Sequence, residues 1–185
     1  MKMFLFCLLA TLCICGCERY APSDPNEKQK LINEVRQKAA KKIYKDLGLI
    51  PCGTGAQAMD QIKMLHLAFD YRKPVDIKTG RELLVAAVQI FAQEINANPE
   101  IRPYLDNYPF EPKNIRIWIF LKNPDGSNIE PEKLCVICAT QGILEYENKN
   151  PETCRLTTIY KETYEEALQK IQESHTEITS GQNTQ

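Results

Sequence analysis

The apolar residues of this chain change their period near residue 115. In the first half they recur about every four positions, as at Leu31, Val35 and Ala39, which gathers them on one face of an α-helix. From Ile115 to Leu121 the period is two, which is typical of β-strands. Because helices precede a run of strands, the sequence predicts an α+β fold.

The two periods divide the chain into eight main elements and one short helix. The expected helices cover about 25–47, 80–97, 98–105 and 163–174, and the expected strands cover 62–71, 115–121, 134–139, 143–147 and 155–161. Short connections between the last four strands predict an antiparallel meander sheet of four to five strands with helices packed on one face. The segment 62–71 is the fifth strand, at an edge, and the glycines and proline of 49–60 indicate a loop.

Two patterns predict helix starts. Thr79 with Glu82, and Thr163 with Glu166, have the spacing of capping boxes. We therefore predict one α+β domain over residues 25–174. The polar residues 175–185 predict a disordered tail.

Composition excludes several classes of protein. The chain has 185 residues, of which 43% are apolar and 25% charged, close to the average of globular domains. The 23 basic and 24 acidic residues give a net charge of −1, so no overall field attracts nucleic acid, and we expect no nucleic-acid partner.

The N-terminus has the features of an export signal. The twelve residues from Met3 to Ile14 follow Lys2, carry no charge and are mostly apolar. A membrane-spanning helix needs about 20 residues, whereas this run has the length of a signal-peptide apolar region. It ends at Ile14-Cys15-Gly16-Cys17, which resembles a bacterial lipobox: an aliphatic residue, a small residue and the acceptor cysteine.

This resemblance implies a lipoprotein. Residues 1–16 would be the signal peptide, and Cys17 would carry diacylglycerol through a thioether and an N-acyl chain. No other cofactor is expected. Residues 17–24 would be a tether to the membrane of the cell envelope, inner or outer. The alternatives are a soluble exported protein cleaved near Gly16 and a cytosolic protein with an apolar start.

Four cysteines lie outside the N-terminal segment: Cys52, Cys135, Cys138 and Cys154. An oxidising compartment permits disulfides, and four cysteines allow three full pairings, which stay open. Cys135 and Cys138 have CxxC spacing inside an expected strand. Their Cα atoms would be about 10 Å apart, beyond bridging distance, and their side chains would point to opposite faces, so we predict buried structural thiols.

Little in the sequence supports a metal site, a nucleotide site or a catalytic nucleophile. His66 and His175 are the only histidines, no metal-ligand spacing is present, and His66 is expected to be partly buried and hydrogen-bonded. Gly48–Thr54 resembles a phosphate loop but lacks its lysine, so no nucleotide is expected. A nucleophilic site would join Cys52, His66 as base and Asp70.

Three groups of residues are candidate contact surfaces. Lys38, Lys41, Lys42 and Lys45 share one face of the first helix, either as a solvated face or as a contact to anionic headgroups. Tyr104, Tyr108 and Phe110 lie among prolines and either cover one end of the core or meet a partner. Trp118 and Phe120 share a strand face with Arg116, which is either covered by a helix or free to bind.

The sequence therefore predicts a lipid-anchored envelope protein, a non-enzymatic binding module that contacts the membrane through its lipid and other envelope proteins through its domain. The alternative is an exported thiol-dependent or hydrolytic enzyme that uses Cys52 and His66. A third hypothesis is a domain whose edge strand pairs with a partner strand.

Overall fold

The computed structural model describes residues 25–181. The elements in chain order are α1 (Pro25–Leu47), β1 (Ile50–Gln57), β2 (Met64–Tyr71), α2 (Ile77–Asn96), the 3₁₀ turns η1 (Arg102–Tyr104) and η2 (Pro112–Asn114), β3 (Ile115–Leu121), β4 (Leu134–Thr140), β5 (Ile143–Lys149), β6 (Leu156–Thr163) and α3 (Tyr164–Gly181). The predicted α+β class is confirmed. The predicted signal peptide (1–16), the lipid acceptor Cys17, the tether up to residue 24 and the end of the predicted tail (182–185) lie outside the described residues.

The strands form one six-stranded sheet in the order β1-β2-β3-β4-β5-β6. All neighbours are antiparallel except β2 and β3, which are parallel because α2 forms the crossover between them. The predicted count of four to five strands is therefore wrong, and so is the purely antiparallel pairing. The segment 62–71 is also not at an edge, because β2 lies between β1 and β3.

The extra strand is β1, which occupies the segment predicted to be a loop. Its Pro51 is tolerated because an edge strand leaves one row of backbone groups unpaired. A Cβ atom on Gly53 would lie 3.3 Å from that of Ala68, so the small residue allows β1 to approach β2 closely. Proline and glycine suggest a loop by composition, but an edge strand tolerates both.

Of the two capping boxes predicted from the sequence, one is wrong and the other is confirmed. Asp76 caps α2 by accepting a hydrogen bond from the backbone N–H of Thr79 at 2.8 Å, so the capping box predicted at Thr79 is wrong. The box at α3 is confirmed: the Thr163 N–H donates to Glu166 at 2.7 Å, and the Glu166 N–H donates to the Thr163 hydroxyl at 3.1 Å.

The segment 98–105 contains the turn η1 rather than a short helix, although Ile101 and Leu105 are buried as expected. Pro103 lacks an N–H donor, so the segment cannot continue as a regular α-helix. At the other end of the chain, α3 continues to Gly181, so residues 175–181 of the predicted disordered tail are helical.

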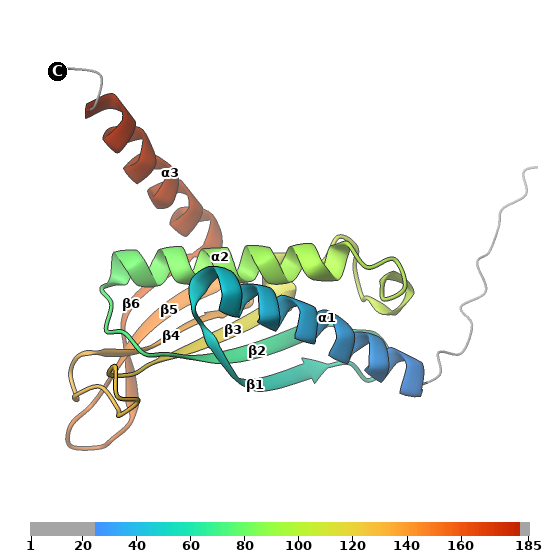
Figure 1. Ribbon diagram of the computed structural model, residues 1–185, viewed down its shortest axis with the longest axis horizontal. Helices are drawn as coiled ribbons and strands as arrows, with labels where there is room; N and C mark the ends of the chain where they lie inside the picture. The colour runs from blue at the N-terminus through green and yellow to red at the C-terminus, as the bar shows by residue number, and fades with distance from the viewer. Residues whose placement is uncertain (1–24, 182–185) are drawn as a thin grey trace, which may run out of the picture.

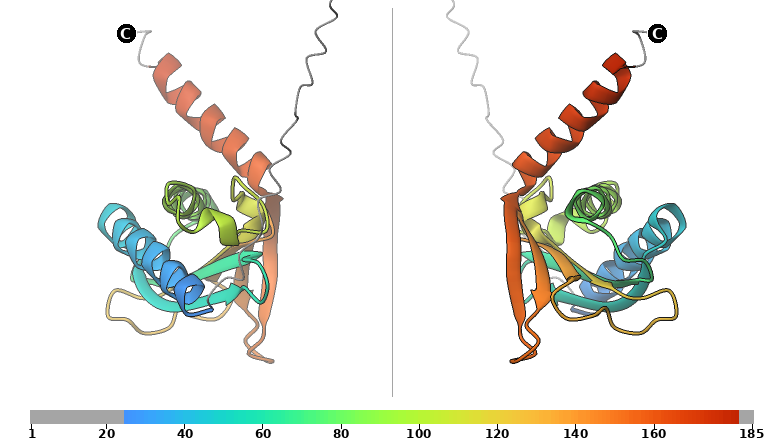
Figure 2. Two further views of the ribbon diagram at one scale, coloured as in Figure 1. Left: turned by 90° about the vertical axis from the view of Figure 1, so that its right-hand side faces the viewer. Right: turned by 90° about the vertical axis from the view of Figure 1, so that its left-hand side faces the viewer.

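A single apolar core lies between the helices and one face of the sheet. Buried residues of α1 and α2 join one cluster with alternate residues of the strands, such as Leu67, Ile117 and Leu144. Figure 2 shows α1 and α2 on the same side of the sheet, and Figure 1 shows α3 projecting away from the body beyond its first turns.

Candidate functional site

The sheet has a second face, which points away from the core and which we call the open face. Strand residues alternate between the two faces, so the neighbours of the core residues belong to it. Its central members are His66 and Ala68 of β2, Arg116, Trp118 and Phe120 of β3, Val136 and Cys138 of β4, and Glu145 and Glu147 of β5. In both views of Figure 2 the ribbon of no helix lies over this side.

Trp118 is at the centre of the open face. Its backbone is paired with Ala68 on one side and Cys138 on the other. Its ring lies 6.2 Å from the ring of His66 and 6.0 Å from that of Phe120, the latter in an edge-to-face arrangement. The three rings form a continuous aromatic strip, and each is partly exposed.

Three polar atoms around this strip are shielded from solvent and have no hydrogen-bond partner: Nε2 of His66, Nε of Arg116 and Nε1 of Trp118. Most buried donors in native proteins are paired, because a buried unpaired group costs about 1–3 kcal/mol. The expected hydrogen bond of His66 is therefore absent at Nε2. Burial, Arg116 and Arg36 together lower the pKa of His66, so its imidazole is neutral at pH 7.

Charged side chains border the aromatic strip. Glu145 forms an ion pair of 2.9 Å with Lys161 of β6. Burial and the neighbouring Glu145 raise the pKa of Glu147. An aromatic centre with a charged border is the usual composition of protein–protein interfaces.

The open face continues past Phe120 into a hollow of about 630 Å³ between the β3–β4 and β5–β6 connections. Phe120, Val136 and Leu156 line it, and Leu156 is 43% exposed. Apolar side chains therefore continue from the aromatic strip on β3 to the edge strand β6.

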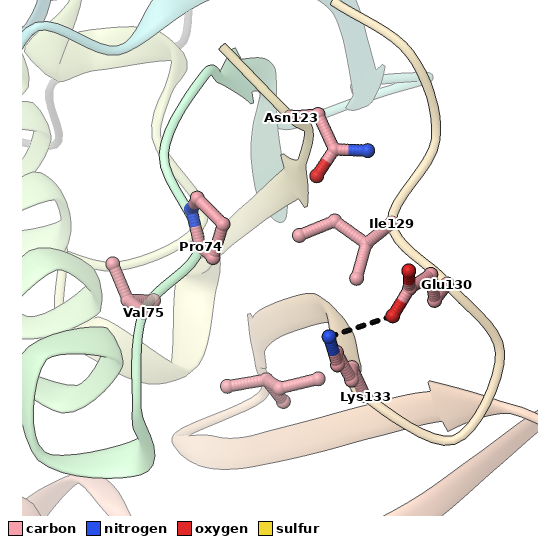
Figure 3. Close-up of a pocket in the computed structure, with 7 residues that line it drawn as sticks. Pro74, Val75, Asn123, Ile129, Glu130 and Lys133 are labelled. Atoms are coloured by element: carbon pink, nitrogen blue, oxygen red, sulfur yellow. Dashed lines mark ion pairs between the residues drawn. The ribbon is translucent and has the colours of Figure 1, made fainter.

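Figure 3 shows a smaller hollow of about 320 Å³, formed by the link between β2 and α2 and the connection between β3 and β4. Lys133 and Glu130 form an ion pair of 2.6 Å beside Ile129, and both charged side chains are largely exposed. The charges are already paired with each other, so we assign no ligand chemistry to this hollow.

The structure does not assemble the nucleophilic site of Cys52, His66 and Asp70. His66 is paired with Gly55, three residues from Cys52, which corresponds to about 10 Å along a strand. Asp70 is four residues from His66 on the same strand. Burial and Asp70 raise the pKa of Cys52, which favours the thiol over the nucleophilic thiolate.

The cysteines among the described residues are free thiols. Cys138 is buried, and burial with Glu147 and Glu145 raises its pKa to about 12. Cys135 packs against the core on the opposite face of β4 but is only partly buried, so the prediction of a buried thiol holds for Cys138 and is wrong for Cys135. Cys154 is exposed in the β5–β6 connection.

The three aromatic residues Tyr104, Tyr108 and Phe110, predicted as a candidate contact surface, differ in their exposure. Phe110 is 1% exposed and belongs to the core, so the prediction of a partner contact there is wrong. The sequence alone does not show that the Asn96 side chain holds the Phe110 backbone at both its N–H and its carbonyl. The Tyr104 hydroxyl donates to Glu27 at 3.0 Å, and Tyr108 is 49% exposed beneath the guanidinium of Arg102.

The four lysines of α1, Lys38, Lys41, Lys42 and Lys45, are all exposed. Lys42 forms an ion pair of 3.4 Å with Glu94 of α2. Within residues 25–181 no group of side chains has the composition of a metal site, and no helix there has both the length and the apolar character needed to cross a bilayer.

A buried polar cluster joins β5, β6, α2 and α3 around Glu162. Its carboxylate accepts from Arg81 at 2.6 Å, Lys170 at 2.7 Å, the Tyr146 hydroxyl at 2.7 Å and the Tyr160 hydroxyl at 3.3 Å. Burial alone would raise the pKa of Glu162, but the hydrogen bonds outweigh it and hold that pKa below its ordinary value. Because the carboxylate is surrounded by donors, we interpret the cluster as structural.

Comparison of the chain with protein-family models, with curated proteins and with solved structures gives no match. Alternation along one strand predicts that Trp118, Phe120 and Arg116 share a face, but it does not predict His66 and Cys138 as their neighbours, because the register between strands is a tertiary property.

Proposed function

We propose that this protein is a lipid-anchored, non-enzymatic binding module of the cell envelope, and that the open face binds another envelope protein. The anchor is Cys17, through its diacylglycerol and N-acyl chains. An extended tether of eight residues reaches at most about 28 Å, so the domain stays close to the bilayer surface. We propose that the exposed lysines of α1 face the bilayer, where anionic headgroups attract each basic side chain by about 1 kcal/mol.

One observation carries the proposal: the unpaired polar atoms of His66, Arg116 and Trp118 cluster around an aromatic strip. An apolar side chain at these positions would avoid the cost of an unpaired donor. Residues that lower stability without a structural gain are typical of functional sites. Aromatic and arginine side chains also supply most of the binding energy of interfaces.

The fold supports the same proposal. In our interpretation α1 and α2 pack on one face of the sheet and provide the stability of the domain, while the other face stays free for a partner. The charged border of Glu145, Glu147 and Arg116 limits which partners fit, because charges on a partner must complement it.

Metabolic labelling with an alkyne fatty acid tests the anchor. We expect the native chain to take up the label and the Cys17→Ala variant to take up none, because the acceptor thiol is absent. Cys52→Ala, which removes an exposed thiol from the domain, is the matched control and keeps the label. Equal labelling of the native chain and Cys17→Ala would refute the anchor.

Site-specific photocrosslinking in living cells tests the open face. A photoreactive amino acid at Lys161, beside Glu145, is expected to give a discrete adduct with one envelope protein, identified by mass spectrometry. The same amino acid at Lys45, exposed on α1, is the control and gives no such adduct. We expect Trp118→Leu to abolish the adduct at Lys161 while the melting temperature stays equal or rises.

Equal adducts from both positions, or an adduct that survives Trp118→Leu, would show that the open face is not the binding surface. A folded variant without the adduct would support the proposal, because loss of structure would then not explain the loss of binding.

A further inference from the structure

A hollow of about 470 Å³ lies between α1 and the edge strand β1, on the other side of the sheet from the open face. Polar side chains of Asn33, Gln37 and Thr54 line it together with Arg36 and Cys52. None of its lining residues is acidic. The hollow therefore offers hydrogen-bond donors and a positive charge, and the carboxylate of Asp70, which contacts Cys52, is not among the residues that line it.

Arg36 is 7% exposed, and its Nε atom is buried without a hydrogen-bond partner. Burial lowers the pKa of its guanidinium, and no carboxylate acts against this effect. Lys28, two turns earlier on α1, is equally buried, but it donates to the backbone carbonyls of Met59 at 2.5 Å and Asp60 at 3.2 Å. Of these two buried cations, Arg36 is the one that lacks an acceptor among the described residues.

A second hollow of about 410 Å³ adjoins the first, since both are lined by Gln37, Ala40 and Pro51. Its walls are mostly apolar and include Tyr44, which is 56% exposed, and Ile50. The groove between α1 and β1 therefore has a cationic part and an adjoining apolar part.

We propose that this groove binds a small monocarboxylate with an apolar tail. The carboxylate pairs with the guanidinium of Arg36, whose planar donors match it in a bidentate geometry, and the tail lies along Tyr44 and Ile50. Arg36 is the buried cation of the groove and matches one negative charge, while Lys41, which also lines the second hollow, is exposed to solvent. Binding supplies the acceptor that a buried guanidinium requires, since an uncompensated buried charge is costly. This inference does not depend on the open face.

Cys52 makes the site measurable, because it lines the groove and is exposed, whereas Cys154 is exposed outside it. The full chain, with its anchor in phospholipid nanodiscs, is alkylated with iodoacetamide in the presence of hexanoate. The two cysteines are quantified by mass spectrometry. We expect hexanoate to slow alkylation of Cys52 in a saturable way and to leave Cys154 unchanged, while hexanol and inorganic phosphate protect neither.

Arg36→Met tests the charge. We expect the hexanoate concentration that gives half protection to rise roughly tenfold or more, since a hydrogen-bonded charge pair contributes on this scale. Lys30→Met, which removes an exposed charge from the same helix, is the control and leaves this concentration unchanged.

Tyr44→Ser tests the tail without touching the core. We expect weaker protection by hexanoate and unchanged protection by acetate. Unchanged protection by hexanoate in Arg36→Met or Tyr44→Ser, equal slowing of Cys154, or no protection in the native chain would overturn the proposal. Protection by phosphate equal to that by hexanoate would overturn it too, because the groove would then be a plain anion site.

Discussion

At the scale of single residues, the buried polar groups within residues 25–181 include one densely hydrogen-bonded cluster and several atoms without a partner. Glu162 accepts four hydrogen bonds, whereas Arg36, His66 and Trp118 each bury an atom without a partner. The paired cluster stabilises the fold, and the unpaired atoms mark the two surfaces that we propose bind ligands or partners.

Glu162→Gln should destabilise the protein strongly. The substitution leaves Arg81 and Lys170 beside a neutral amide, and removing one partner of a buried ion pair costs about 3–5 kcal/mol. Urea unfolding measures the change. Glu145→Gln, which breaks the more exposed pair with Lys161, is the control and should cost about 1 kcal/mol or less. Equal losses in the two variants would contradict the structural role of the cluster.

His66 should make stability depend on pH below neutrality. Its pKa is lowered in the folded state, so between that value and its ordinary 6.5 the unfolded chain binds more protons. The free energy of unfolding therefore falls as the pH falls through this window.

His66→Gln should flatten the dependence when urea unfolding is followed from pH 7.5 downward. Glu147, whose raised pKa acts in the opposite direction, stays in both proteins and cancels in the comparison. An identical pH profile in native chain and variant would contradict the expected neutral, buried imidazole.

At the scale of elements, α2 approaches the sheet closely at Gly80. A Cβ atom there would lie 3.3 Å from the side chain of Ile137, which is tighter than most Cβ contacts, and 3.5 Å from Tyr146, which is ordinary van der Waals contact. The missing side chain thus sets the distance between the first turn of α2 and strands β4 and β5.

Gly80→Leu should therefore lower the free energy of unfolding by about 1–3 kcal/mol through overpacking. Lys78→Leu, two residues away on the exposed side of α2, is the control and should stay within about 0.5 kcal/mol of the native value. Thermal or urea unfolding distinguishes the two. If Gly80→Leu were neutral, the helix would be free to move away from the sheet.

At the scale of the whole molecule, one core connects α1, α2 and the sheet. The buried residues of these elements form a single cluster rather than two. A chain with one core unfolds in one cooperative transition.

The only tryptophan, Trp118, reports on the sheet, while circular dichroism reports mainly on the helices. We expect the two signals to give the same urea midpoint and slope for the full chain. Different midpoints would show that helices and sheet unfold as separate units. Trp118 lies in the middle of the sheet, so its fluorescence does not depend on the fraying of edge strands.

The sequence by itself determined the α+β class, the long helices, the four strands after residue 115 and the capping box of α3. These features depend on the spacing of residues along a short segment, which the chain carries locally. It also identified Trp118, Phe120 and Arg116 as one strand face, because alternation fixes which side chains share a side.

Only the tertiary structure decided that 50–57 is an edge strand, that β2 pairs in parallel with β3, that Phe110 is buried and that Arg36 lacks an acceptor. Each of these features depends on contacts between segments that are distant in the sequence, and the spacing of residues within one segment does not encode such contacts. A glycine-rich segment becomes a strand when a neighbour supplies its hydrogen bonds, and an arginine is unpaired only once the fold has placed every carboxylate elsewhere.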